Sequence, residues 1–383
     1  MSRVATVFYI GFVWLLIAGF ATQPSIFLAA YLVACALYVL AHARRLTRLT
    51  RSELASLGLM LAGPTSLVVI GIARDGPTVA FHWIISVTAA IAACAATRNS
   101  AVYSLMSKWG LIGAQLFVLA YLARTGVYGF PLENLIPGHS SNGITSYLVV
   151  LQINYSIVTF VLQRRVPWIT LMASLGICLV GYGRGSILAV VSLILASLVV
   201  SVVPSRRRSA FLQLLFVAGC IAGLVTFRAQ LVQFADANTK IGAGLEDPGR
   251  ALMLQQYVTQ LNPGTALLGG SYDNTVINRD FRGNPHNSFI RGHHLFGLGY
   301  LLVIIFLPWY VAAKSRMRMA GKGYFLMLVL ILYTRAFTEP ILFPTVFDFF
   351  FFGMCFIALT RDAGSPEPVA EGVSGAQLIG ETI

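Results

Sequence analysis

The sequence predicts an all-α, polytopic membrane protein with about 12 transmembrane helices and one large outward-facing loop. Of its 383 residues, 57% are hydrophobic and 11% are charged, whereas a soluble domain carries about 25% charged residues. The apolar residues come in runs of roughly 17 to 20, the length that crosses a bilayer as a helix. The alternating segments of about ten residues that would indicate a membrane barrel are missing. The composition therefore excludes a soluble globular enzyme and a disordered protein.

The apolar runs divide the chain into four regions. The expected spans are 5–21, 25–42, 55–73, 78–97, 108–124, 144–163, 167–181, 186–203, 210–227, 295–312, 323–338 and 341–360. The first nine occupy 1–227, a polar loop with short helices follows at 228–294, and the last three spans lie in 295–360. A connection as long as this loop is uncommon unless it is functional. The tail 361–383, rich in Gly, Ser, Pro and Glu, is expected to be disordered.

The positive charges orient these spans. With the N-terminus in the cytoplasm, 17 of the 27 Lys and Arg residues fall on the cytoplasmic side, as the positive-inside rule requires. Both termini are then cytoplasmic and the large loop faces outward. Since the positives form short clusters between spans, the net charge of +13 does not indicate nucleic-acid binding. The five cysteines all lie in apolar runs and are interpreted as small buried hydrophobes.

Two outward arginines are candidates for binding a phosphate group. Arg184 lies in Gly-Tyr-Gly-Arg-Gly-Ser, a very short connection that keeps it at the membrane surface. Arg250 opens a short amphipathic helix after Pro248, where the helix dipole opposes a cation. An arginine can clamp a phosphate with two parallel hydrogen bonds. The alternatives are that Arg184 snorkels to lipid phosphates and that Arg250 is a solvated loop residue.

A histidine near the end of the loop is the candidate general base. His286 lies in Gly-Asn-Pro-His-Asn-Ser-Phe, just before the tenth span, and an imidazole can accept a proton at neutral pH. A zinc site built from this histidine and the later His293 and His294 is the rival interpretation, but no acid or cysteine follows at ligand spacing. We therefore expect no metal and no cofactor.

Supporting positions are expected around these three residues. They are Asn287, Arg291, Arg282, Tyr272, Arg335 and Asp348. Arg335 and Glu339 are four residues apart and are predicted to pair on one helical face. Asp348 lies in a Phe-rich span, where a carboxylate is costly and needs a partner. We expect Arg184, Arg335 or another donor to supply that partner, and a purely structural ion pair is the alternative.

Several outward arginines with one histidine suit a particular reaction. The arginines can bind a diphosphate and replace the charge of a metal ion, and the histidine can activate a hydroxyl. The fitting reaction is attack by a sugar hydroxyl on a substrate whose leaving group is a membrane-held diphosphate.

These residues also resemble a known family. Arg184, Arg250, the Leu-Gly-Gly turn at 268–270, His-Asn-Ser-Phe at 286–289 and Phe-Gly-Leu-Gly at 296–299 are similar to motifs of the O-antigen ligase and O-antigen polymerase superfamily. The resemblance covers about 167–312 by motif and the remainder by span count.

The resemblance implies a C-type membrane glycosyltransferase of the bacterial inner membrane with a periplasmic active site. Its donor would be an oligosaccharide on undecaprenyl diphosphate, held by Arg184 and Arg250, and its acceptor a lipid-linked chain or lipid A-core. His286 would activate the acceptor hydroxyl, with inversion and without a metal. Membrane lipids and other polysaccharide-assembly proteins are further partners that the resemblance suggests, and nucleic acid is not.

The sequence does not decide which activity of the family the protein would have. The compact loop favours a polymerase of O-antigen or exopolysaccharide repeat units over an O-antigen ligase. A polysaccharide or lipid transporter would instead carry charged residues near the midplane of several spans. A non-catalytic scaffold would tolerate the loss of His286.

Overall fold

The computed structural model describes residues 25–46, 49–127, 131–135, 141–202 and 248–360, together with the isolated positions 11, 14 and 17. These residues form helices and turns and contain no strand. Seven helical stretches among them are long and apolar enough to cross a membrane, so the protein is a helical, multi-pass membrane protein. Three shorter apolar helices accompany them. Of the predicted regions, spans 5–21 (apart from the isolated positions) and 210–227, the loop up to 247 and the tail lie outside the described residues.

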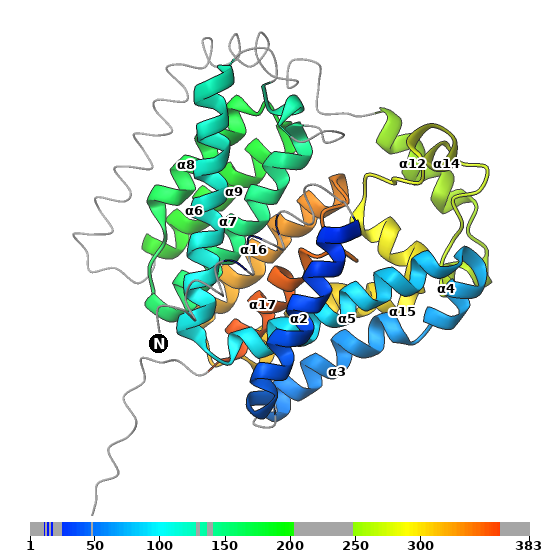
Figure 1. Cartoon of the computed structure of the whole chain (residues 1–383), viewed down its shortest axis with the longest axis horizontal. Helices are drawn as coiled ribbons and strands as arrows, with labels where there is room; N and C mark the ends of the chain where they lie inside the picture. Colours follow the sequence, from blue (N-terminus) through cyan, green and yellow to red (C-terminus); the bar gives the residue numbers. More distant parts are fainter. Residues whose placement is uncertain are drawn as a thin grey trace, which may run out of the picture.

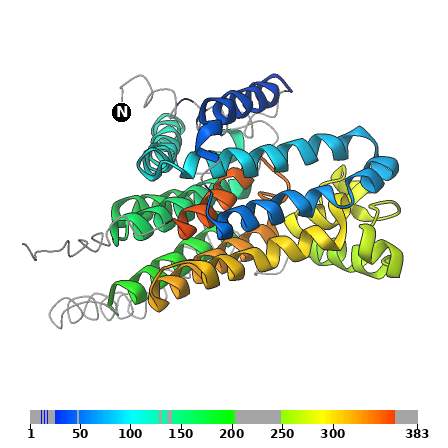
Figure 2. The ribbon, with the colours of Figure 1, turned by 90° about the horizontal axis from the view of Figure 1, so that it is seen from below.

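The helices follow the chain in the order expected from the apolar runs. They are α2 (Ser25–Leu46), α3 (Arg51–Thr65), α4 (Val68–Asp75), α5 (Pro77–Thr97), α6 (Ser100–Thr125), η1 (Pro131–Asn134), α7 (Ser141–Gln163), α8 (Trp168–Val180), α9 (Arg184–Val202), α12 (Pro248–Thr259), α13 (Pro263–Leu268), α14 (Val276–Phe281), α15 (Ser288–Lys314), α16 (Met319–Thr338) and α17 (Asp348–Leu359). Helices α6 to α9 lie together on one side of the bundle, and α2, α3, α5 and α15 lie on the other (Figure 1). The short helices α12 and α14 cover one end of the bundle (Figure 2).

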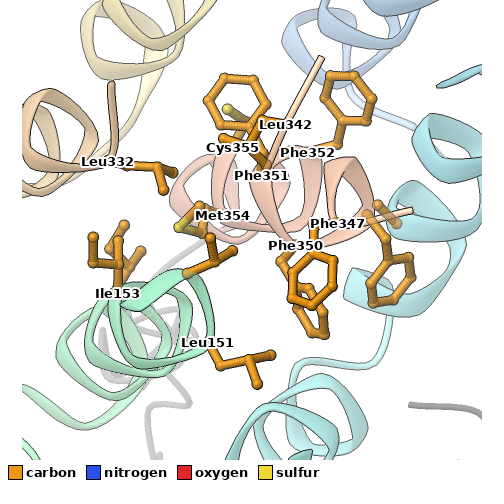
Figure 3. Packing of buried hydrophobic residues seen from close by; sticks show 14 of the residues in the cluster. Leu151, Ile153, Leu332, Leu342, Phe347, Phe350, Phe351, Phe352, Met354 and Cys355 are labelled. Atoms are coloured by element: carbon orange, nitrogen blue, oxygen red, sulfur yellow. The ribbon is translucent and has the colours of Figure 1, made fainter. Parts of the chain in front are cut away.

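Helix α17 is the centre of the packing. It contacts α5, α7, α15 and α3, and every residue from Asp348 to Leu359 is buried. A helix that is apolar on all sides is stable only when it is covered all round. Its phenylalanines fill the space between the surrounding helices, against residues such as Ile153 and Leu332 (Figure 3).

The last predicted span differs from its expected form. The sequence predicts a span over 341–360, but residues 341–347 form a non-helical strap and α17 begins only at Asp348. Pro340 and Pro344 explain the difference, because proline lacks an amide hydrogen and disfavours helix in the preceding residue. Twelve helical residues extend about 18 Å, less than the ~30 Å hydrocarbon core.

Non-helical backbone at membrane depth is tolerated where its polar groups are paired inside the protein, and the strap meets this condition. Asp348 accepts hydrogen bonds from the amides of Phe343 and Thr345, at 2.9 and 3.2 Å. Ser288, at the start of α15, accepts from the amide of Leu342 and donates to the carbonyl of Glu339. The strap is therefore fastened at both of its ends.

The same contacts show which donors bond to Asp348. Its carboxylate bonds to backbone amides of the strap, rather than to the guanidinium of Arg184 or Arg335. A carboxylate that accepts two amide hydrogen bonds is satisfied without an ion pair. Asp348 therefore shapes the strap that follows Glu339.

Helix α15 is broken at Gly297, within the Phe-Gly-Leu-Gly motif. Gly297 has φ +73° and ψ −173°, a conformation that L-residues with a side chain rarely adopt. A Cβ at this position would lie 2.6 Å from the carbonyl oxygen of Leu267 and 2.7 Å from Leu67. The break therefore lets α13 and the α3–α4 corner pack directly on α15.

Candidate functional site

The candidate site lies where one end of the bundle meets the segment that precedes α15. A single carboxylate, Glu339, joins its parts. Glu339 follows the last residue of α16 and is 4% exposed. Its Oε1 atom lies 2.9 Å from Arg250 Nη2 and 3.6 Å from Arg335 Nη2, and its Oε2 atom lies 3.9 Å from His286 Nδ1. These four residues are called the Glu339 cluster below.

The cluster keeps its carboxylate ionised. Burial raises the pKa of Glu339, but the neighbouring His286 and the guanidinium groups of Arg335 and Arg250 have the larger combined effect, so the pKa lies below its usual range. A buried carboxylate between two arginines is favoured in its charged form. Glu339 is therefore an anion at neutral pH.

His286 reaches the cluster through a sharp turn. Its φ is +46°, and its amide donates to Asn284 Oδ1 at 3.0 Å. The imidazole packs edge-on against Phe281, and 30% of the side chain is exposed. Its Nδ1 atom is buried without a hydrogen-bond partner among the described residues and faces the anionic Glu339. In a neutral imidazole that carries its proton on Nδ1, the lone pair of Nε2 can act as a base.

Arg335 ties three helices together. Its guanidinium donates to Ser186 at 3.2 Å, to the carbonyl of Asn142 at 3.0 Å, to Thr338 at 2.6 Å and also to Ser146. These partners lie on α9, α7 and α16. The predicted pairing of Arg335 with Glu339 is confirmed. With its donors so occupied, Arg335 holds the shape of the site.

Arg184 lies beside the cluster. It is the first residue of α9, and the next residue, Gly185, is so close to Arg335 that a Cβ there would lie 2.9 Å from Nη1. Arg184 Nη1 is buried and has no hydrogen-bond partner among the described residues, and Asn142 Oδ1 on α7 is in the same condition. An arginine with an unpaired guanidinium donor therefore directly precedes a glycine that lies against Arg335 of the cluster.

Arg250 is more engaged than Arg184. It lies in the first turn of α12, which begins at Pro248 as the sequence predicts. Its Nη2 bonds to Glu339 and its Nη1 donates to the carbonyl of Thr338 at 2.5 Å. The contacts explain why an arginine occupies a position that the helix dipole opposes, because α12 is fastened through it to the end of α16.

The helix ends add further positive potential. Helices α7 and α9 both begin here, at Ser141 and Arg184, and the free amide groups of a helix N-terminus favour an anion. The guanidinium groups of Arg250 and Arg335 face one carboxylate here, and Arg184 begins the neighbouring helix α9. The site is therefore suited to a ligand with more than one negative charge.

The supporting residues divide into two groups. Asn287 is the N-cap of α15, and its Oδ1 accepts from the amides of Phe289 and Ile290. Tyr272, Arg282 and Arg291 lie together on the walls of a separate cavity of about 680 Å³. That cavity is also lined by Asp75 and His82, which no sequence pattern marks as functional, and by His294, which the sequence marks only as part of the rival zinc site.

His293, the neighbour of His294, has a structural role. His293 Nδ1 lies 2.7 Å from the hydroxyl of Tyr257, and its Nε2 lies 2.7 Å from the carbonyl of Ala266. Both nitrogens are thus used to hold α12 and α13 against α15. In the described ranges, no three His, Cys, Asp or Glu side chains come together in a way that could hold a metal ion.

Comparisons with known proteins add nothing to this geometry. No protein-family model, no curated protein and no solved structure matches the chain.

Proposed function

We propose that the protein is an inverting membrane glycosyltransferase that uses a glycan on undecaprenyl diphosphate as its donor. The supporting observation is the Glu339 cluster, in which a histidine faces a buried anionic carboxylate beside several guanidinium groups. This combination offers a base for a hydroxyl and a positive field for a diphosphate leaving group.

In the proposed reaction, the hydroxyl oxygen of the acceptor sugar attacks the anomeric carbon of the donor. The bond between that carbon and the diphosphate oxygen breaks, and undecaprenyl diphosphate leaves with the bonding electrons. The hydroxyl proton moves to Nε2 of His286. Glu339 stabilises the resulting imidazolium through Nδ1, the arrangement that orients a catalytic histidine in hydrolytic triads. A single displacement inverts the anomeric centre.

Arg184 is assigned to the diphosphate. Its unpaired donor and the N-termini of α7 and α9 are available to bind oxygens of the leaving group. Arg250 is assigned a shared role, since it also carries charge next to Glu339. Three cationic side chains supply charge that a divalent ion would supply elsewhere, so turnover is expected to survive a chelator.

The topology proposed with this reaction has twelve spans, cytoplasmic termini and a site at the periplasmic face of the bacterial inner membrane. It is supported by how the described charges are distributed. Arg74, Arg250 and Arg335 are all predicted to face outward. Arg74 bonds to Gly269 in the loop region, and Arg250 and Arg335 both contact Glu339. Arg98 and Glu53, near predicted cytoplasmic loops, pair with each other instead.

The most informative test uses the purified protein and a lipid-linked oligosaccharide, alone and with lipid A-core. A ladder of longer lipid-linked chains without the second acceptor identifies a polymerase, the activity we favour. A product formed only with lipid A-core identifies an O-antigen ligase.

His286→Ala should lower the rate at which either product forms by a factor of about 100 or more, the usual contribution of a general base. Arg279→Gln is the matched control, because Arg279 is exposed and pairs only with Asp280 among the described residues. Equal rates for His286→Ala and the control would disprove the assignment of the base.

A further inference from the structure

The cavity next to the Glu339 cluster has the size and lining of a ligand site. It lies between α4, α5, the start of α15 and the strap, and its volume is about 680 Å³. Ligand pockets in proteins have volumes of about 300 to 1,000 Å³. The cavity is separate from the cluster, since Glu339, His286 and Arg250 are not among its lining residues.

The charge of the cavity favours an anion. Arg291 from α15 and Arg282 from the turn after α14 both line it. Neither guanidinium forms a hydrogen bond or an ion pair with another residue in the described part of the chain. Asp75 is the single acid among the described lining residues, and Arg74 already pairs with it at 2.6 Å. Neither guanidinium is therefore in contact with a carboxylate in the described part of the chain, although the charge of Asp348 acts on Arg291 from a longer distance.

Two further polar groups in the walls also lack partners. The Nδ1 atom of His82 and the hydroxyl of Tyr272 are buried, and neither has a hydrogen-bond partner among the described residues. Buried polar groups are nearly always hydrogen-bonded, so each exception calls for an explanation. Hydroxyl groups of a bound ligand would satisfy both.

The walls are partly aromatic and are held by hydrogen bonds to the backbone. The ring of Tyr272 stacks on His294, with centroids 3.8 Å apart and planes at 19°. His294 Nδ1 is held 2.7 Å from the carbonyl of Gly270, and Arg74 bonds to the carbonyls of Gly269 and His294. The ring of Phe81 also faces the cavity. Aromatic faces with a few convergent polar groups are the usual lining of a site for a small organic ligand.

The lining selects a singly charged sugar over a phosphate group. Asp75, Asn284 and Thr345 add hydrogen-bond acceptors to the walls, and acceptors need a ligand that carries hydroxyl donors. A hexuronate has one carboxylate for the arginines and several hydroxyls for the remaining groups.

The cavity and the Glu339 cluster are built from the same two segments. The segment 282–291 supplies Arg282 and Arg291 to the cavity and His286 to the cluster. The strap supplies Thr345 to the cavity and starts two residues after Glu339 of the cluster. A ligand in the cavity is therefore next to the proposed base.

We propose that this cavity binds an acidic sugar unit, of the hexuronate class, and that it is the pocket for the acceptor glycan. The binding of the acidic sugar stands on the cavity alone. Its assignment to the acceptor rests on the proposed glycosyltransferase function.

Binding without turnover tests the proposal. The purified full-length protein is titrated with methyl glucuronide, methyl glucoside and inorganic phosphate, and binding is followed by saturation-transfer NMR. The glucuronide is expected to bind about tenfold or more tightly than the glucoside, since one charge-assisted contact contributes this much. Phosphate should not displace it at equal concentration. Equal binding of the two glycosides, or displacement by phosphate, would overturn the proposal.

Variants then assign the preference to the cavity. Arg291→Gln should remove most of the preference for the glucuronide, and Arg282→Gln at the exposed rim, where folding is not at risk, should reduce it. Arg279→Gln is the matched control, because Arg279 is exposed and does not line the cavity. Retention of the full preference by both Arg282→Gln and a folded Arg291→Gln would refute the site.

His286→Ala separates the two proposals. It should leave the preference for the glucuronide over the glucoside unchanged, because His286 does not line the cavity that holds the two arginines. If the glucuronide binds as expected but the protein transfers no glycan, the sugar site stands and its assignment to an acceptor falls with the proposed function. If transfer occurs without any preference for acidic sugars, the cavity proposal fails alone.

Discussion

Replacing Glu339 by glutamine is the sharpest perturbation of the site. The amide keeps the size of the side chain but removes the charge that faces His286 at 3.9 Å. At an effective dielectric constant of about 20, a carboxylate and an imidazolium at this distance attract by about 4 kcal/mol. His286 is partly exposed, so water screens this attraction, and we take about 2 kcal/mol as its lower bound. The transition state carries the imidazolium, so the rate should fall by about 30- to 1,000-fold.

The assay is the rate of chain extension at a saturating concentration of lipid-linked donor. Asp280→Asn is the matched control, because it also converts a carboxylate to an amide, but at an exposed residue outside the cluster. Melting in detergent should be recorded as well, since Arg250 and Arg335 lose a buried counter-charge, and breaking such a pair costs about 3 to 5 kcal/mol. A folded Glu339→Gln variant that extends chains at the wild-type rate would refute the role given to the carboxylate.

Three further predictions concern neighbouring residues. Arg184→Lys should weaken donor binding and Arg184→Gln should abolish it, because one ammonium cannot make two parallel bonds to a phosphate; equal donor titration curves for lysine and wild type would contradict this. Asp348→Asn should lower stability by about 1 to 3 kcal/mol, because an amide nitrogen cannot accept from the strap, and a thermal melt equal to that of wild type would contradict it. The pKa of Glu339 is lowered in the folded protein, so its stabilising effect is full above the unfolded pKa of about 4.3. It is lost as the pH falls through the lower folded pKa, so melting curves of wild type and Glu339→Gln should differ at pH 7 and converge at strongly acidic pH.

The sequence predicts the helical membrane fold and one pair in the site. Apolar runs are long and carry few charges, so hydropathy alone places most of the helices. The pairing of Arg335 with Glu339 follows from their spacing of four residues, which brings them to one face at the end of α16.

The remainder of the site depends on contacts that spacing does not contain. Arg250 and His286 both contact Glu339. No local sequence pattern predicts that these two distant residues meet a carboxylate at the end of α16. The apolar residues of the strap predict a helix, whereas Pro340 and Pro344 disfavour a helix in this segment. The cavity combines Asp75 and His82 from the α4–α5 corner with Arg291 far along the chain, so only the tertiary structure reveals it.

The most direct test of the central claim is an electron cryomicroscopy structure of His286→Ala with a lipid-linked oligosaccharide trapped in place. The account predicts diphosphate oxygens within about 3 Å of the Arg184 guanidinium, beside the N-termini of α7 and α9, with the first sugar facing position 286. A diphosphate bound in the cavity beside Arg291, or at the end of the bundle where Arg98 pairs with Glu53, would contradict it.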